Sequence, residues 1–466
     1  MPRRLVLATG AAALVVVVTA PSVGELTDAP EPTGTAGCVS ETGSGGACRD
    51  GTALENALGV TTTADGKSVY VASDVSDAIA VFVRDSASGA LTQSAGAAGC
   101  VSETGTGGLC RDGRALNAPN GVAASADGKS VYAASIGSDA IAIFDRSPAT
   151  GALIQKPGIA GCISETSSGG ACRDGRALDG ALDVVVSTDG KSVYIASQLS
   201  DAVAIFDRDP ATGALTQKVG AAGCVSDTGT NGLCKDGNAL DGILSIAASA
   251  DGTSVYAAST NSDGVAILDR NPATGALAQK DNTAACVSKS GAGMACQVGN
   301  ALDSAAGVAT SADGKSVYVA SQRSDAVTIF DRDPATGALT QKVGATGCIS
   351  EKGAGPGPCR HGRGLDGAIG IAVSPDGRRV YATAIGSDAV VVFDRDRATG
   401  ALAQSPGAAG CISQTGVGAC RDGTALDFAR DITATWNGKT VYVASAISDA
   451  VVIFEDRSGG FRLVGN

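Results

Sequence analysis

Cysteine is the most regularly placed reactive residue in this sequence. Its 14 copies form seven pairs whose members stand ten residues apart, or eleven and nine in the last two pairs. Paired cysteines suggest metal binding in a reducing cytosol and disulfides outside it, and neither C-x-x-C nor the Cys/His spacing of zinc sites is present. Because the N-terminus indicates export, we predict seven local disulfides: Cys38–Cys48, Cys100–Cys110, Cys162–Cys172, Cys224–Cys234, Cys286–Cys296, Cys348–Cys359 and Cys411–Cys420.

The first 24 residues indicate export. Two arginines, Arg3 and Arg4, precede an apolar run over 5–20 and then small residues, which is typical of a secretory signal peptide. We predict a signal peptide over 1–24, with cleavage between 24 and 29, and a linker over 25–37. An uncleaved anchor is the alternative, although the apolar run is shorter than the about 20 residues that a span needs. The mature chain is therefore expected to have no membrane span and to be secreted or extracytoplasmic, with cell-surface association left open.

Charged residues accompany every cysteine pair, as Glu41, Arg49 and Asp50 do in the first. In the fifth pair Lys289 and Gln297 stand at the first two of these places, so seven equivalent sites cannot form. We interpret these charges as solvated groups and turn-stabilising aspartates. Calcium binding stays open, although no EF-hand-like or nonapeptide motif is present.

The only histidine, His361, is a candidate general base. No nucleophile or orienting carboxylate is near it in sequence, so we interpret it as a substitution on an exposed loop. The sequence implies no cofactor. A net charge of -12 and the lack of a basic cluster oppose binding to nucleic acid.

These residues belong to one unit copied seven times. The first cysteines of successive pairs are 62 residues apart, with one final step of 63. The tyrosines keep the same period: Tyr70, Tyr132, Tyr194, Tyr256, Tyr318, Tyr381 and Tyr442. A period of this size predicts a repeat architecture, so we expect one domain over 38–466 although length alone suggests about three.

Each unit is expected to be a four-stranded sheet. In the second unit Asp127-Gly128 is a hairpin signal, and Pro148-Ala-Thr-Gly151 is a tight turn between β-prone runs. The expected strands are residues 121–125, 130–135, 140–144 and 152–155. Seven such sheets without helices predict an all-β fold, a seven-bladed β-propeller with four antiparallel strands per blade and one disulfide-stapled loop per repeat. An open solenoid is the alternative, but it would need atypical polar end repeats, and the end units match the middle ones.

The seventh unit reads as complete, because residues 461–465 can supply its fourth strand. We therefore expect no strand donated from the N-terminus, and a Cys38–Cys48 loop that lies across the seam between the last and first blades. The cysteine loops and the Ser-Asp loops after each second strand should share one face. Function generally lies on such loops, so this loop-rich face is the expected recognition surface.

Residues 311–341, SADGKSVYVASQRSDAVTIFDRDPATGALTQ, resemble the YVTN-type repeats of bacterial surface propellers and of lactonase-like seven-bladed propellers. The resemblance covers the four-strand part of every repeat and implies the propeller fold. It also implies a phosphogluconolactonase or carboxymuconate cyclase type of activity at the channel mouth. No catalytic residue can be assigned from it, because the sequence shows no matching catalytic motif, and the cysteine loop lies outside the recognised pattern.

A unique ligand site needs positions at which the copies differ. At the start of the first strand the copies read Leu58-Gly59, Asn120-Gly121, Leu182-Asp183, Leu244-Ser245, Ala306-Gly307, Ile369-Gly370 and Arg430-Asp431. We predict that Asn120, Asp183, Arg430 and Asp431 form a polar ligand site at the loop-side mouth of the channel. Neutral surface variation is the alternative.

The function expected from these residues is binding of a ligand or macromolecule through the loop-rich face. Candidate partners are a small molecule, a protein or a surface glycan. A lactonase-like hydrolase or isomerase at the channel mouth is the first alternative, and a structural surface protein is the second.

Overall fold

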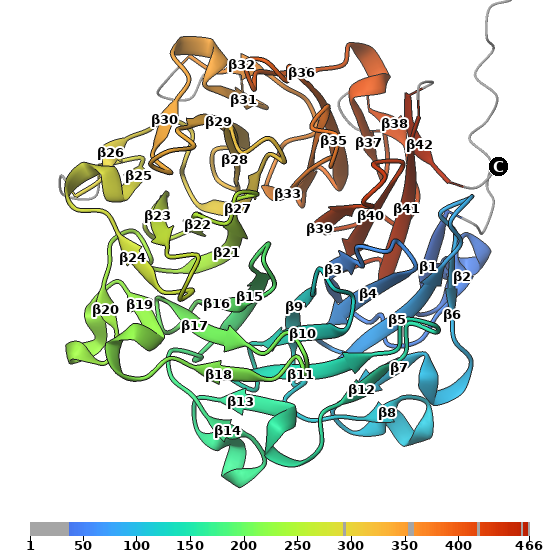
Figure 1. Ribbon diagram of the computed structural model, residues 1–466. Helices are drawn as coiled ribbons and strands as arrows, with labels where there is room; N and C mark the ends of the chain where they lie inside the picture. The colour runs from blue at the N-terminus through green and yellow to red at the C-terminus, as the bar shows by residue number, and fades with distance from the viewer. Residues whose placement is uncertain (1–36, 292–294, 353–357, 417–419, 458–459, 465–466) are drawn as a thin grey trace, which may run out of the picture. The chain divides into compact units, whose positions relative to one another are not determined.

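Seven β-sheets are arranged radially around a common centre in the computed structural model (Figure 1). The structure describes residues 37–291, 295–352, 358–416, 420–457 and 460–464. The predicted signal peptide and all but the last residue of the predicted linker lie outside the described residues. Among the described residues, no helix has the length and apolar character needed to cross a membrane.

Three antiparallel strands form the inner part of each sheet. The first strands, nearest the centre, are β3 (Ala57–Thr62), β9 (Pro119–Ala124), β15 (Ala181–Val186), β21 (Ile243–Ala248), β27 (Ala305–Thr310), β33 (Ala368–Val373) and β39 (Ala429–Ala434). They open blades 1 to 7 in this order. The second strands are β4 (Ser68–Ser73), β10 (Ser130–Ser135), β16 (Ser192–Ser197), β22 (Ser254–Ser259), β28 (Ser316–Ser321), β34 (Arg379–Ala384) and β40 (Thr440–Ser445). The third strands are β5 (Ala78–Arg84), β11 (Ala140–Arg146), β17 (Ala202–Arg208), β23 (Gly264–Arg270), β29 (Ala326–Arg332), β35 (Ala389–Arg395) and β41 (Ala450–Arg457).

The core lies between the blades. Every second strand is almost wholly buried, because both of its faces pack against neighbouring sheets. Its Val, Tyr and Ala side chains suit a pleated surface enclosed on two sides. Blade 1, for example, packs the buried side chains of Val69, Val71 and Phe82 against Tyr442 of blade 7.

The fourth strand position is split into two short segments. The segment that pairs with the end of the third strand is β6 (Leu91–Gln93), β12 (Leu153–Gln155), β18 (Leu215–Gln217), β24 (Leu277–Gln279), β30 (Leu339–Gln341), β36 (Leu402–Gln404) or β42 (Gly460–Leu463). The cysteine segment that pairs with its beginning is β7 (Cys100–Ser102), β13 (Cys162–Ser164), β19 (Cys224–Ser226), β25 (Cys286–Ser288), β31 (Cys348–Ser350), β37 (Cys411–Ser413) or β1 (Cys38–Ser40). In blade 1, Phe82 pairs with Gln93 and Ala80 with Cys100. The cysteine loop is thus part of the sheet.

Each cysteine segment also pairs in parallel with a two-residue strand beyond the disulfide. These strands are β8 (Arg111–Asp112), β14 (Arg173–Asp174), β20 (Lys235–Asp236), β26 (Gln297–Val298), β32 (Arg360–His361), β38 (Arg421–Asp422) and β2 (Arg49–Asp50). Short 3-10 helices join the two outer segments at η2 (Gly96–Ala98), η4 (Gly158–Gly161), η6 (Gly220–Gly223), η8 (Asn282–Ala285), η10 (Gly344–Thr346) and η11 (Gly407–Gly410). Others lie within the cysteine loops at η1 (Gly43–Gly46), η3 (Gly105–Gly108), η5 (Ser167–Gly170) and η7 (Gly229–Gly232).

Blade 7 is built from both ends of the described chain. The long strand β41 pairs with β42 over its second half, where Phe454 faces Leu463, and with β1 over its first half, where Cys38 faces Val452. The expectation that no N-terminal strand is donated was therefore wrong. The reason is that β42 covers only half of the outer edge of β41, and β1 pairs with the remainder. The Cys38–Cys48 loop does reach the seam, since Arg49 donates to the Leu91 carbonyl of blade 1 at 3.1 Å.

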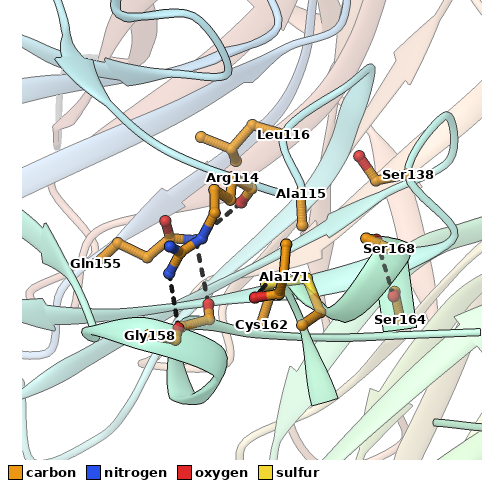
Figure 2. The surroundings of a disulfide bond; sticks show 12 residues. Arg114, Ala115, Leu116, Ser138, Gln155, Gly158, Cys162, Ser164, Ser168 and Ala171 are labelled. Atoms are coloured by element: carbon orange, nitrogen blue, oxygen red, sulfur yellow. Dashed lines mark hydrogen bonds between the residues drawn. A yellow bond between two sulfur atoms is a disulfide. The ribbon is translucent and has the colours of Figure 1, made fainter. Parts of the chain in front are cut away.

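All seven predicted disulfides are confirmed, each within its own loop and with Cα atoms 4.7 or 4.8 Å apart. Figure 2 shows the surroundings of Cys162, where Arg114, which follows the preceding cysteine pair, donates to the Gly158 carbonyl at 2.7 Å. The loop charges also make contacts within the protein: the Glu103 carboxylate accepts from the Leu116 N–H of its own loop, and Arg111 donates to the Leu153 carbonyl of the next blade. The arginine thus links neighbouring blades, which goes beyond the solvated role expected from sequence.

A ring of aspartates closes the propeller on the loop-rich face. The last aspartate of each Ser-Asp loop accepts a hydrogen bond from a backbone N–H at the start of the next blade. The pairs are Asp77 with Ala118, Asp139 with Gly180, Asp201 with Gly242, Asp263 with Ser304, Asp325 with Gly367, Asp388 with Phe428 and Asp449 with Asn56. The last pair joins blade 7 to blade 1, so the ring has no gap.

The opposite face carries the Asp-Gly and Ala-Thr-Gly turns and a second set of links between blades. In each link the arginine that ends a third strand donates to the buried tyrosine of the preceding blade and to the aspartate of that blade's turn. Arg208, for example, donates to the Tyr132 hydroxyl at 2.7 Å and forms an ion pair with Asp127 at 2.9 Å. We call such an arginine, tyrosine and aspartate a clamp. Its five complete copies pair Arg146 with Asp65, Arg208 with Asp127, Arg270 with Asp189, Arg332 with Asp251 and Arg395 with Asp313.

Candidate functional site

The seven first strands begin around a narrow pocket of about 90 Å³ at the loop-rich end of the channel. Each blade contributes its first residues, and most are glycine, alanine, leucine or isoleucine. The four polar residues singled out in the sequence all line this pocket: Asn120, Asp183, Arg430 and Asp431. The structure therefore brings them together, although they come from blades 2, 3 and 7.

Local backbone geometry turns these positions toward the channel. The pairing of the first and second strands shifts register just before Asp183 and Asp431. The neighbouring first strands are also very close here, because a Cβ atom added to Gly59 would lie 2.1 Å from the Asn120 carbonyl oxygen. A glycine at this place allows that approach, and the blades with aspartate instead direct a carboxylate into the channel.

Asp183 and Asp431 make the same contacts in their respective blades. Each accepts from the N–H of the following residue, Val184 or Ile432, at 2.8 Å. The second oxygen accepts from the next blade, where Asp183 receives the Ile246 N–H at 2.9 Å and Asp431 receives the Val60 N–H at 2.8 Å. Each carboxylate oxygen has two lone pairs, so each keeps acceptor capacity for a ligand.

Both carboxyl groups titrate close to neutral pH. Burial raises the pKa of Asp183 to about 6, against the lowering effect of its backbone hydrogen bonds. Burial also raises the pKa of Asp431 to about 7, and the charge of Asp183 adds to this rise. Groups with pKa values in this range can both take and return a proton at neutral pH.

Arg430 has donors that are not used by the protein. Its guanidinium forms no hydrogen bond or ion pair with any described residue, whereas its backbone carbonyl accepts from the Thr383 hydroxyl at 2.8 Å. Burial lowers the pKa of Arg430, and the charges of Asp431 and Asp74 oppose that effect. A planar cation with open donors suits a carboxylate, carbonyl or phosphate oxygen.

Other polar residues have defined places around the mouth. Asn120 is half-buried, and its side chain has no hydrogen-bond partner in the described part of the chain. Thr383 was missed in the sequence, although it is the only threonine where the other six blades have alanine. Its hydroxyl accepts from the Gly370 N–H at 3.0 Å and fixes the backbone of Arg430. His361 lies in β32 and is exposed, away from this pocket.

The comparison with known families agrees with the repeat pattern. The family described as "Lactonase, 7-bladed beta-propeller" matches residues 65–226 and 306–350. The chain is a seven-bladed β-propeller that resembles this family over the matched residues. No curated protein matches it by sequence.

Several solved structures are similar to this propeller in fold. A putative 6-phosphogluconolactonase from Bacteroides uniformis has a TM-score of 0.50 and 18% identity, covering 74% of this chain and 82% of that chain. A second putative 6-phosphogluconolactonase, from Bacteroides fragilis, has a TM-score of 0.50 and 19% identity, covering 75% and 82%. Hydrazine synthase from Kuenenia stuttgartiensis also has a TM-score of 0.50, with 16% identity, covering 87% and 97%. At these identities the likeness concerns the fold, and function must be argued from the site.

Proposed function

We propose that this protein hydrolyses a small lactone at the loop-side mouth of its channel. One observation carries the proposal: the guanidinium of Arg430, with unused donors, adjoins the carboxyl of Asp431, whose pKa is raised to about 7. A cation that can stabilise an oxyanion and a base that can exchange a proton at neutral pH are the two groups that ester hydrolysis requires. The match to the lactonase family supports the choice of ester.

In the proposed reaction, a water molecule attacks the lactone carbonyl carbon while the Asp431 carboxylate takes one of its protons. The new C–O bond places a negative charge on the former carbonyl oxygen, to which Arg430 donates. When this tetrahedral species collapses, the ring C–O bond breaks and the leaving alkoxide receives the proton from Asp431. The product is the open hydroxy acid, and the base is regenerated.

The shape of the mouth limits the substrate. A pocket of about 90 Å³ holds an ester group with a few neighbouring atoms, so the rest of the substrate would lie toward the open, loop-rich side. Asn120 and Asp183 line the same pocket and can bond to substrate hydroxyls. These features favour a small hydroxylated lactone.

The test is a panel of five- and six-membered lactones, with acid release followed by a pH indicator. Asp431→Asn and Arg430→Gln should each lower kcat/KM by about a hundredfold or more, the usual loss on removal of one transition-state contact. Leu244→Ala is the matched control, because Leu244 lines the same pocket with an apolar side chain. Wild-type activity that survives Asp431→Asn would refute the assignment of the base.

Binding without turnover is the second candidate. Both oxygens of Asp431 already accept backbone hydrogen bonds, which favours a holding role for this carboxylate. Calorimetric titration with the open hydroxy acids separates the two functions: a binder retains the ligand through Arg430 and shows no lactone turnover. The disulfide in every repeat supports a site of action outside the cytoplasm.

A further inference from the structure

The clamps on the turn face are altered at two of the seven blade interfaces, and both lie beside blade 7. At the interface of blades 6 and 7, Asp456 stands where the other third strands have the clamp arginine. Arg379 stands where the second strand otherwise begins with serine or threonine. The Asp456 carboxylate accepts from the Tyr381 hydroxyl and forms an ion pair with Arg379 at 3.6 Å. The charges have exchanged sides, and this interface remains neutralised.

At the interface of blades 7 and 1, the exchange is incomplete. Arg84 keeps the clamp position and donates to the Tyr442 hydroxyl at 2.8 Å and the Thr440 hydroxyl at 2.9 Å. The turn of blade 7 has Asn437 where the complete clamps have aspartate. Arg84 is only 6% exposed and has no ion pair with any described carboxylate. A buried cation without a counter-charge is costly, so this place favours an anion.

A pocket of about 690 Å³ opens at these altered clamps, lined by Arg84, Ser86, Ser88, Asn437 and Lys439 among others. We call it the seam pocket. Its volume is that of a small-molecule site, whereas the channel mouth has only about 90 Å³. It lies among the tight turns, on the face opposite the channel mouth.

The acidic residues of the seam pocket already have cationic partners. Asp456 lies near Arg379 at 3.6 Å, Glu455 binds Arg462 at 3.2 Å, and Asp376 lies near Arg378 at 3.8 Å. Arg84 and Lys439 are the two lining cations that have no ion pair among the residues described. The uncompensated charge of the pocket is therefore positive.

We propose that the seam pocket is a second binding site, which takes a small hydroxylated anion. Arg84 and Lys439 hold its carboxylate or phosphate group, while Ser86, Ser88 and Asn437 bond to its hydroxyls. The site is independent of the proposed lactone chemistry, because it shares no lining residue with the channel mouth.

One tryptophan adjoins a lining residue of the seam pocket in the sequence, and its side chain lines a neighbouring pocket. Trp436 is the only tryptophan, is 73% exposed and directly precedes Asn437. Its fluorescence can be followed during titration of the whole protein with D-glucuronate, which carries a carboxylate, and with glucose 1-phosphate, which carries a phosphate. Calorimetry gives the affinities, and neutral D-glucose is the ligand control. Saturable binding of at least one anion, without binding of glucose, is expected; the tighter of the two identifies the preferred acid group.

Two variants test the role of Arg84, and a matched arginine controls for stability. Asn437→Asp restores the clamp carboxylate, so it should weaken anion binding about tenfold or more and raise Tm. Arg84→Gln should weaken binding to a similar extent. Arg208→Gln removes a complete clamp elsewhere and should leave the affinity unchanged. The proposal is overturned if wild type binds neither anion at millimolar concentration, or if Asn437→Asp binds as tightly as wild type.

Discussion

The clamps of the turn face and the channel mouth both contain arginine and aspartate, but the pKa of the aspartate is lowered in the clamps and raised at the mouth. In a complete clamp, burial acts to raise the pKa of Asp251, but hydrogen bonds from Ser249, Thr253 and Arg332 bring it to about 2. At the mouth, burial prevails and the pKa of Asp431 rises to about 7. Where the repeats agree, charges are paired and hold blades together. At the channel mouth, where the repeats differ, the charges of Arg430 and Asp431 remain available for chemistry.

The largest expected effect of a single substitution is the loss of stability when a clamp is broken. Arg208→Ala leaves the Tyr132 hydroxyl and Asp127 without their shared partner between two blades. Because Asp127 retains 31% exposure, we expect a loss of about 3 kcal/mol in the free energy of unfolding, at the low end for a broken buried pair. Asn120→Ala at the mouth should change it by less than about 0.5 kcal/mol. Urea unfolding measures both, and equal losses would remove the distinction between the two regions.

The reverse pattern is expected for activity. Arg430→Gln should leave Tm nearly unchanged, because its guanidinium holds no described residue, and should reduce lactone turnover about a hundredfold. Arg208→Gln should lower Tm and retain turnover in the folded fraction. Steady-state kinetics and thermal melts of both variants measure these two effects. A fully active Arg430 variant would contradict the proposed role of Arg430.

The loss of one disulfide can also be compared with the loss of ring closure. Replacing Cys286 and Cys296 by serine opens a loop of ten residues, for which about 2–3 kcal/mol is expected if the loop is unstrained. Removing residues 430–466 deletes most of blade 7 and should abolish cooperative unfolding. Calorimetry distinguishes the two, and a truncated chain that melts like wild type would contradict the closed ring.

The clamps and the channel mouth affect the stability of the protein over different ranges of pH. The folded state raises the pKa of Asp183 from 3.8 to about 6 and that of Asp431 from 3.8 to about 7, so it retains protons that the unfolded chain releases. Their contribution to stability is therefore present at low pH and is lost as pH rises from about 4 to 7. The clamp aspartates have lowered pKa values and lose their contribution only as pH falls below about 4. Asp431→Asn should flatten the slope of Tm between pH 4 and 7, and an unchanged slope would show that Asp431 is ionised throughout.

Much of the fold could be predicted from the sequence, because each position of the repeat occurs in seven copies. The constant cysteine spacing predicted every disulfide, and the strands of the second unit were predicted to within about two residues. The polar departures at Asn120, Asp183, Arg430 and Asp431 lie together in the lining of the channel pocket. Whether they bind a ligand stays a prediction.

The missed features depend on contacts between different repeats. The donated strand β1 was missed because the length of β41 relative to β42 is a property of the assembled sheet. The link from the cysteine-loop arginines to neighbouring carbonyls was missed for the same reason. The seam pocket had a signal in Asn437 and Asp456, but its meaning required knowing that the arginine and aspartate at these places face each other across blades.

The central claim is that Asp431 serves as a base at an asymmetric channel mouth, and a pH–rate profile tests it most directly. For wild type, kcat/KM on a lactone should rise with pH and level off above about 7, as the Asp431 carboxylate becomes ionised. Asp183→Asn removes a negative charge that raises the pKa of Asp431, so the rise should move to lower pH. Asp431→Asn should abolish the rise together with the activity. A profile that is identical in wild type and Asp431→Asn would contradict the account.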